Sequence, residues 1–215
     1  MKATSFNTGW TCRHLGSSAP GTPVTLPHDA MLAEERSQTS AGGTNTGWFA
    51  GYDYLYEKHF TPDAAQAAQC AVLEFEGVYH NAEVHLNGEK IASCPYGYSD
   101  FYADLTGKLL PGRDNVLEVI AHNADQPNSR WYSGAGINRN VWLMETKAVC
   151  IPDGGVYTHA GRAADGGWDL RVETEVLEPA EERSAEAELH LYDGDSEILP
   201  SSVEEAESLA AVQGH

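Results

Sequence analysis

The chain has 215 residues, 41% of them hydrophobic, which is enough for one large domain or for one domain and part of a second. Its 32 acidic and 13 basic residues give a formal net charge of −19, which argues against nucleic-acid binding because such proteins neutralise phosphates with clustered Lys and Arg. No stretch approaches the roughly 20 apolar residues of a membrane span, and no signal peptide follows Met1, so we expect a cytoplasmic protein without nucleic-acid or membrane partners.

Segments in which bulky and polar residues alternate run through the first two thirds of the chain and predict β-strands. A period of two places one set of side chains on a buried face and the other set toward water. Asn87-Gly88 separates two such runs and is the strongest hairpin signal, while Pro111-Gly112 marks a later turn. Short strands with turns between them favour an antiparallel sandwich or barrel. The expected strands lie in residues 52–60, 71–78, 82–93, 115–123 and 140–145.

The pattern of charge and spacing changes near residues 147–152, which predicts a domain boundary. We expect a first domain of residues 1–147 and the start of a second one in residues 148–215. The second part is shorter than the roughly 100 residues of a seven-stranded sandwich, so we expect it to be truncated and the chain to be cut from a longer protein. Its candidate elements are strands in residues 154–161, 167–178 and 184–193 and a tail of helix-friendly composition in residues 203–215.

Neither the cysteines nor the acidic clusters suggest a metal or a cofactor. The four cysteines, Cys12, Cys70, Cys94 and Cys150, are widely spaced and contain no C-x-x-C pair, so they predict buried thiols rather than a zinc site or a disulfide framework. Residues 192–197, YDGDSE, have two aspartates two positions apart but lack the rest of a calcium loop. We expect a hairpin turn there.

The nine histidines do not cluster either. His80, His85 and His122 lie on or beside predicted strands, and we expect them to be packed or exposed rather than to act as ligands.

Five segments in chain order resemble the N-terminal sugar-binding domain of glycoside hydrolase family 2, the family of β-galactosidases, β-glucuronidases and β-mannosidases. They are VTLPHDAML, GWFAGYDYLYEKHF, LEFEGVYHNAEVHLNGEKIASCPYGYSDFYADLT, NVLEVIAHN and SRWYSGAGINRNVWL. Ala30 stands where the family usually has Trp, and Cys94 stands near the place of a usual His. The resemblance covers residues 5–147, with a looser match to an immunoglobulin-like second domain after them.

This resemblance implies an all-β chain, with a jelly-roll (galactose-binding-like) β-sandwich followed by a partial immunoglobulin-like β-sandwich. In the family a (β/α)₈ barrel follows and carries the two catalytic glutamates, one of them in an Asn-Glu pair. This chain contains no Asn-Glu dipeptide and ends before any such barrel. Glu181-Glu182 and Glu204-Glu205 lie in a solvated acidic stretch and are not expected to be catalytic.

We therefore expect no catalytic residue here and no hydrolysis by the chain alone. The parent protein is expected to be a glycosidase, most simply a β-galactosidase, that acts on carbohydrate as a homo-oligomer.

The segment SRWYSGAGINRNVWL, residues 129–143, is expected to form the last loop and strand of the jelly roll. In the family this loop approaches the barrel and helps to shape the innermost sugar subsite, which makes Asn128, Arg130 and Trp131 the candidate substrate contacts. A guanidinium can bind a sugar hydroxyl or a carboxylate, and an aromatic face suits the C–H-rich face of a sugar. The alternative is that Arg130 pairs internally and that Trp131 fills the base of the loop.

Asp29, in the LPHD segment with His28, is a fourth candidate substrate contact. The alternative for this pair is a turn, fixed by Pro27, in which the side chains satisfy backbone groups.

Three further residues of the loop have expected structural roles. Arg139 is expected to hold the loop or the next domain through a buried ion pair. Gly134 and Gly136 are expected to allow a positive φ or a close backbone approach.

Three functions remain open. The first is the accessory domain of a family 2 glycosidase, the second a stand-alone carbohydrate-binding module, and the third a purely structural interface domain. A subsite shared with a barrel is only half built in this chain, so we expect it to bind no monosaccharide by itself, which calorimetry with galactose, glucuronate and mannose would test.

Overall fold

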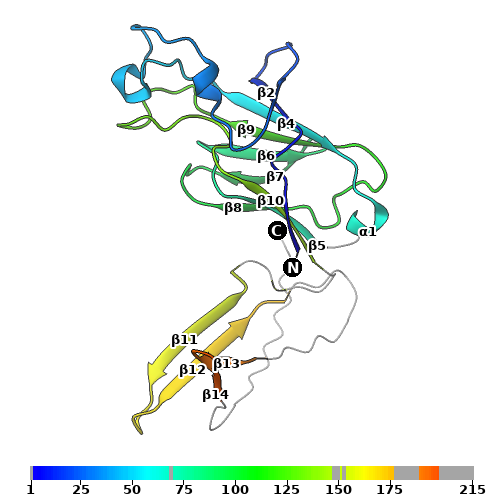
Figure 1. Ribbon diagram of the computed structural model, residues 1–215, viewed down its shortest axis with the longest axis vertical. Coiled ribbons are helices and arrows are strands. Elements are labelled where there is room, and N and C mark those ends of the chain that lie inside the picture. Colours follow the sequence, from blue (N-terminus) through cyan, green and yellow to red (C-terminus); the bar gives the residue numbers. More distant parts are fainter. Residues whose placement is uncertain (1, 68–69, 147–150, 152–153, 177–188, 199–215) are drawn as a thin grey trace. The chain divides into compact units, whose positions relative to one another are not determined.

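The computed structural model in Figure 1 describes residues 2–67, 70–146, 151, 154–176 and 189–198. The chain divides into two units, Met1–Ala180 and Glu181–His215. The first unit contains a six-stranded sheet, a four-stranded sheet and a two-stranded sheet, and the second contains one more two-stranded sheet. The pairings within all four sheets are antiparallel.

The six-stranded sheet has the order β3-β2-β4-β9-β6-β7. Its strands are β2 (Trp10–His14), β3 (Thr22–Val24), β4 (Tyr54–Phe60), β6 (Ala82–Leu86), β7 (Glu89–Cys94) and β9 (Asn115–Ala121). The four-stranded sheet has the order β1-β10-β5-β8. It consists of β1 (Lys2–Ser5), β5 (Cys70–Phe75), β8 (Phe101–Asp104) and β10 (Val141–Thr146).

Side chains from both sheets form one core between the two layers that Figure 1 shows. β9 alternates buried and half-buried residues along its whole length, as a strand with one face on a core does. Tyr54 and Tyr56 of β4 pack in the same cluster as Leu73 and Phe75 of β5, all at most 1% exposed. Burial of each such side chain is worth about 1.5–3 kcal/mol.

In the part of the chain that the structure describes, the loops that leave the sandwich contain three short helices: two 3₁₀ turns, Ala30–Ala33 and Gly43–Thr46, and α1 (Ala64–Ala67). Asp29 caps the first of them, because its Oδ1 accepts a hydrogen bond from the Met31 amide at 3.0 Å. None of the helices among the described residues is long and apolar enough to cross a membrane.

The later strands form two hairpins. In the first unit, β11 (Val156–Arg162) pairs with β12 (Trp168–Thr174). In the second unit, β13 (Leu191–Asp193) pairs with β14 (Ser196–Ile198) around Gly194, so the YDGDSE segment is a hairpin, as predicted.

The predicted all-β sandwich is confirmed, and each expected strand that lies wholly in the described residues is present. Asn87 and Gly88 form the predicted hairpin turn between β6 and β7, with φ of 52° and 85°. The sequence did not predict β1, β2, β3 or β8. Several predictions concern positions outside the described residues. These positions are the boundary at 147/148, residues 184–188 of one expected strand, the tail at 203–215, Cys150 and the two glutamate pairs. Neither the domain division nor the immunoglobulin-like identity of the later strands is tested, and both stay predictions.

The predicted burial of the cysteines holds for Cys12, Cys70 and Cys94. Burial raises the pKa of the Cys12 thiol to about 11, because a desolvated thiolate is disfavoured. Cys12 therefore behaves as a small core side chain.

Candidate functional site

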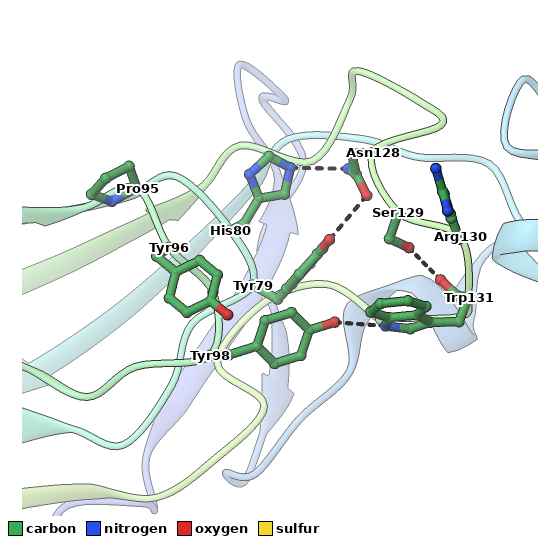
Figure 2. A pocket seen from close by; sticks show the side chains of 10 residues that line it. Tyr79, His80, Pro95, Tyr96, Tyr98, Asn128, Ser129, Arg130 and Trp131 are labelled. Carbon is green, nitrogen blue, oxygen red and sulfur yellow. Dashed lines mark hydrogen bonds between the residues drawn. The ribbon is translucent and has the colours of Figure 1, made fainter.

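A pocket of about 580 Å³ opens where three loops of the sandwich meet. The first loop follows β5, the second follows β7, and the third connects β9 to β10. Figure 2 shows the side chains that face it, with rings from the first two loops on one side and the third loop on the other. The lining residues are Tyr79, His80, Pro95, Tyr96, Gly97, Tyr98, Asn128, Ser129, Arg130 and Trp131.

Three of the four candidate residues therefore lie in one pocket, since Asn128, Arg130 and Trp131 all line it. Asp29 does not line it. The structure also adds Tyr79, His80, Tyr96 and Tyr98, which sequence reasoning did not select. Their one signal was the dense spacing of aromatic residues in the YHN and PYGYSDF stretches.

Three aromatic rings of the pocket remain open to solvent. Tyr96 is 62% exposed, Tyr98 37% and Trp131 61%. The Trp131 indole Nε1 donates a hydrogen bond to the Tyr98 hydroxyl at 3.0 Å, which holds the two rings side by side (Figure 2). The alternative in which Trp131 fills the base of the loop is therefore wrong.

Trp131→Ala is accordingly expected to change the free energy of unfolding by at most about 1 kcal/mol, as for other surface side chains. Trp10→Ala is the contrasting variant, because Trp10 is 1% exposed and donates from Nε1 to the Phe6 carbonyl at 2.8 Å. Loss of this buried ring is expected to cost about 3–5 kcal/mol. Urea unfolding of both variants makes the comparison, and similar losses would show that Trp131 is a packing residue.

The Asn128 amide organises the wall of the pocket rather than facing a ligand. Its Oδ1 accepts a hydrogen bond from the Tyr79 hydroxyl at 3.2 Å. Its Nδ2 donates to Asn123 Oδ1 at 2.8 Å and to His80 Nε2 at 2.9 Å (Figure 2). Since these partners use both N–H groups, Asn128 positions Tyr79 and His80.

This contact also fixes the state of the His80 ring. Nε2 must be unprotonated to accept from the amide, so the neutral ring carries its proton on Nδ1. Burial lowers the pKa of His80 below 6.5, in agreement with a neutral imidazole.

The stability that neutral His80 contributes is complete above pH 6.5 and is lost as the pH falls toward the folded pKa, because the unfolded chain takes up a proton first. His59 provides the opposite case, since its hydrogen bond with Asp114 raises its pKa above 6.5. Its contribution is complete below pH 6.5 and is lost as the pH rises through the folded pKa. An NMR titration should give midpoints on opposite sides of 6.5, and a His80 midpoint at or above that of His59 would contradict the effect of burial on His80.

Arg130 is the one charged side chain that lines the pocket, and it is exposed. Among the described residues, no ion pair or hydrogen bond holds its guanidinium, so internal pairing does not explain it. Its five N–H donors are available to a ligand with paired acceptors, such as two neighbouring hydroxyls or a carboxylate.

Asp29 supports the loop before β10 through hydrogen bonds. This agrees with the alternative stated for Asp29, in which its side chain satisfies backbone groups. Its Oδ1 accepts from the Ala135 amide at 2.9 Å as well as from Met31, and its Oδ2 accepts from the Tyr132 hydroxyl at 2.6 Å. The carboxylate thus joins the loop after residue 28 to the loop before β10. A direct contact with substrate stays a prediction.

The two glycines of the loop have the conformations predicted for them. Gly134 has a φ of 71° and lies against the Asp29 carboxylate, which would be 2.6 Å from an added Cβ. Gly136 has a φ of 101°, and an added Cβ would lie 2.0 Å from the hydroxyl oxygen of buried Tyr56. Gly136 also pairs with Tyr79 through two backbone hydrogen bonds of 2.8 and 2.9 Å, which joins the first and third loops.

The prediction of a buried ion pair for Arg139 is wrong. Arg139 is exposed, and its Nη1 donates to the carbonyls of Glu76 and Tyr98 at 3.3 and 3.5 Å. The Glu76 carboxylate accepts instead from the Trp142 indole at 2.8 Å and from Asn140, and these bonds lower its pKa. No carboxylate of the described residues forms an ion pair with Arg139. Arg139 instead holds the loops around the pocket through hydrogen bonds to backbone carbonyls.

The pocket offers binding groups but no catalytic pair. Its lining includes no Asp or Glu. Within the described ranges, no three His, Cys, Asp or Glu side chains gather as a metal ion would require. Retaining glycoside hydrolysis needs two carboxyl groups about 5–5.5 Å apart, and the residues that line this pocket do not include such a pair.

Residues 10–169 match the protein family described as glycosyl hydrolase 2 galactose-binding domain-like. The chain is 42% identical over 162 residues to the β-galactosidase BoGH2A of Bacteroides ovatus, a match that covers 71% of this chain and 19% of that enzyme. It is 27% identical over 203 residues to a β-glucuronidase of Formosa agariphila, which covers 83% of this chain and 20% of the relative. The chain thus spans about a fifth of the length of these curated relatives.

The fold matches solved structures as well. A crystal structure of a β-glycosidase from Bacteroides vulgatus aligns with a TM-score of 0.70 and 27% sequence identity, over 85% of this chain and 25% of the other. The similarity again falls on a minor part of a longer protein.

Proposed function

The chain belongs to the glycosyl hydrolase 2 galactose-binding domain-like family, and on that premise we propose that it is the N-terminal, sugar-contacting part of a retaining family 2 glycosidase, most simply a β-galactosidase. The observation that carries the proposal is the pocket that brings Arg130 and Trp131 together with Tyr96 and Tyr98. In this proposal the chain supplies binding groups, and a (β/α)₈ barrel supplies the two glutamates.

The chemistry of the pocket supports a carbohydrate ligand. Sugars present C–H-rich faces that stack on aromatic rings and hydroxyl edges that pair with polar groups. Trp131 offers the first kind of surface and the Arg130 guanidinium the second. Remote binding of this kind helps catalysis by holding the substrate in position at the reacting carbon.

The choice of a galactoside rests on the 42% identical relative, which is named a β-galactosidase. The relatives named β-glucuronidase or putative β-glucuronidase are more distant, at 25% to 32% identity. Oligomerisation of the parent enzyme, as a dimer or tetramer, is part of the same proposal.

The first test uses the 215-residue chain with nitrophenyl β-galactoside, β-glucuronide and β-mannoside. We expect no release of nitrophenol above buffer, because the pocket lacks a carboxylate pair. Extension of the chain through its natural reading frame into a barrel should restore turnover of the galactoside. Turnover by the chain alone would overturn the accessory role.

Arg130→Lys separates binding from folding. Because Arg130 is exposed and has no partner among the described residues, we expect the thermal midpoint of the chain to stay within about 1 °C, as for neutral surface changes. A lysine keeps the charge but loses the planar fork, so kcat/KM of the barrel-bearing enzyme should fall about 10-fold, as for the loss of one well-placed hydrogen bond. Equal kcat/KM for the two enzymes would remove Arg130 from the sugar site.

A further inference from the structure

The three exposed rings of the pocket form one connected cluster rather than isolated side chains, with the Tyr96 and Tyr98 rings at 62° to each other. Tyr96 and Tyr98 come from the loop after β7, and Trp131 comes from the loop before β10. The Tyr96 and Tyr98 rings lie 5.7 Å apart, and Trp131 follows through its hydrogen bond to the Tyr98 hydroxyl. Figure 2 shows the Tyr98 ring between the Tyr96 and Trp131 rings. Exposed apolar surface gathered in this way marks an interaction site.

This surface is held in place before any ligand arrives. Tyr98 packs edge-on against Tyr79 at 5.4 Å, and Tyr79 is 5% exposed and fixed by Asn128. Gly97 lies so close that a Cβ there would be 2.3 Å from the Tyr79 ring. A ligand that stacks on Tyr98 therefore pays little to order that ring, and preorganisation of this kind favours affinity.

The pocket has the volume of a small-molecule binding site. Its volume of about 580 Å³ falls in the range of about 300–1,000 Å³ that encloses a drug-sized ligand. A single pyranose stacked on Trp131 would leave Tyr96, the most exposed of the three rings, open to water. A chain of two or more sugars would cover both ends.

The polar groups that remain free to bind a ligand suit an uncharged oligosaccharide. The hydrogen-bonding groups of Asn128 and Tyr79 are used within the protein, which leaves the Arg130 guanidinium for hydroxyl pairs. A single guanidinium in a chain of net charge −19 does not make an attractive site for a polyanion.

From these observations we propose that the pocket binds a neutral oligosaccharide of at least two units, stacked across Trp131 and Tyr96. This rests on the proposed function, since it takes the ligand to be a carbohydrate, and it adds that the recognised unit is a chain rather than a terminal sugar. It also states that the 215-residue protein binds the oligosaccharide by itself, without a contribution from the barrel.

The test is isothermal titration of the 215-residue chain with galactose and with β-1,4-linked galactobiose, galactotriose and galactotetraose. We expect the tetrasaccharide to bind at least 10-fold more tightly than galactose. Tyr96→Ala should remove most of that gain. Tyr157→Ala is the matched control, because Tyr157 of β11 is 59% exposed against 62% for Tyr96 and does not line the pocket.

The outcomes distinguish a failure of this proposal from a failure of the proposed function on which it rests. Equal affinity for galactose and galactotetraose would overturn the oligosaccharide proposal but leave a sugar site. The absence of binding by all four sugars would also overturn it, and the proposed function would then depend on kcat/KM of pocket variants in the barrel-bearing enzyme. Tighter tetrasaccharide binding that survives Tyr96→Ala would place the ligand elsewhere and reject the stacking surface.

Discussion

Gly136→Ala is expected to lower the free energy of unfolding by about 2–5 kcal/mol, one of the largest effects in the chain. Two costs combine at this position. A φ of 101° is strained for any residue with a side chain, and the added methyl would lie 2.0 Å from the Tyr56 hydroxyl oxygen. Tyr56 is completely buried, so it cannot move aside without disturbing the core.

The matched control for this variant is Gly16→Ala. Gly16 has a φ of 79° but no atom within 4 Å of an added Cβ, so it reports the backbone cost alone, about 1–2 kcal/mol. Urea unfolding of both variants gives the steric contribution by difference. Equal losses would mean that the loop moves freely away from Tyr56, which the two hydrogen bonds between Gly136 and Tyr79 argue against.

Asp29→Ala is expected to cost about 2–4 kcal/mol, because it removes three hydrogen bonds to a charged acceptor, two of them from backbone amides. The amides of Met31 and Ala135 would be left without this acceptor. The loop that carries Arg130 and Trp131 should loosen as a result. Thermal unfolding measures the loss, and hydrogen exchange at Ala135 measures the loosening.

A double-mutant cycle of Asp29→Ala with Tyr132→Phe tests whether Asp29 stabilises the protein by anchoring the loop that carries Tyr132. Tyr132→Phe removes one of the three bonds and keeps the ring, so it should cost about 1–2 kcal/mol. If Asp29 acts through this loop, the double variant should lose less than the sum of the single variants, because the two changes share one bond. Additive losses would show that Asp29 and Tyr132 stabilise the fold independently.

Among the strands that the sequence predicted, β9 shows the alternation most clearly, since its buried and half-buried residues alternate along its whole length. β4, β5 and β9 each place a regular set of residues in the core. β1 and β3 gave no such signal, since every residue of β1 is exposed and β3 contains Pro23 at the edge of its sheet. These edge strands are held by pairing with β10 and β2, which is a long-range effect that a local pattern does not contain.

The candidate site was predicted only in part, because long-range contacts bring some of its residues together. Arg130 and Trp131 are neighbours in one loop, so the sequence could select both. Tyr79 and Tyr98 reach this loop only after folding, through the Tyr79–Gly136 backbone pair and the Trp131–Tyr98 hydrogen bond. The partner of Arg139 was predicted wrongly because a backbone carbonyl is an acceptor that no sequence pattern reveals.

The most direct test of a sugar-contacting role for this pocket is kcat/KM on nitrophenyl β-galactoside in the barrel-bearing enzyme, for Trp131→Ala and Trp168→Ala. The two tryptophans are 61% and 64% exposed, and Trp168 of β12 does not line the pocket. We predict a fall of about 10-fold or more for Trp131→Ala, as for loss of a stacking contact worth about 1.4 kcal/mol, and less than a twofold change for Trp168→Ala. Equal kcat/KM for the two variants would contradict the role of this pocket in sugar recognition.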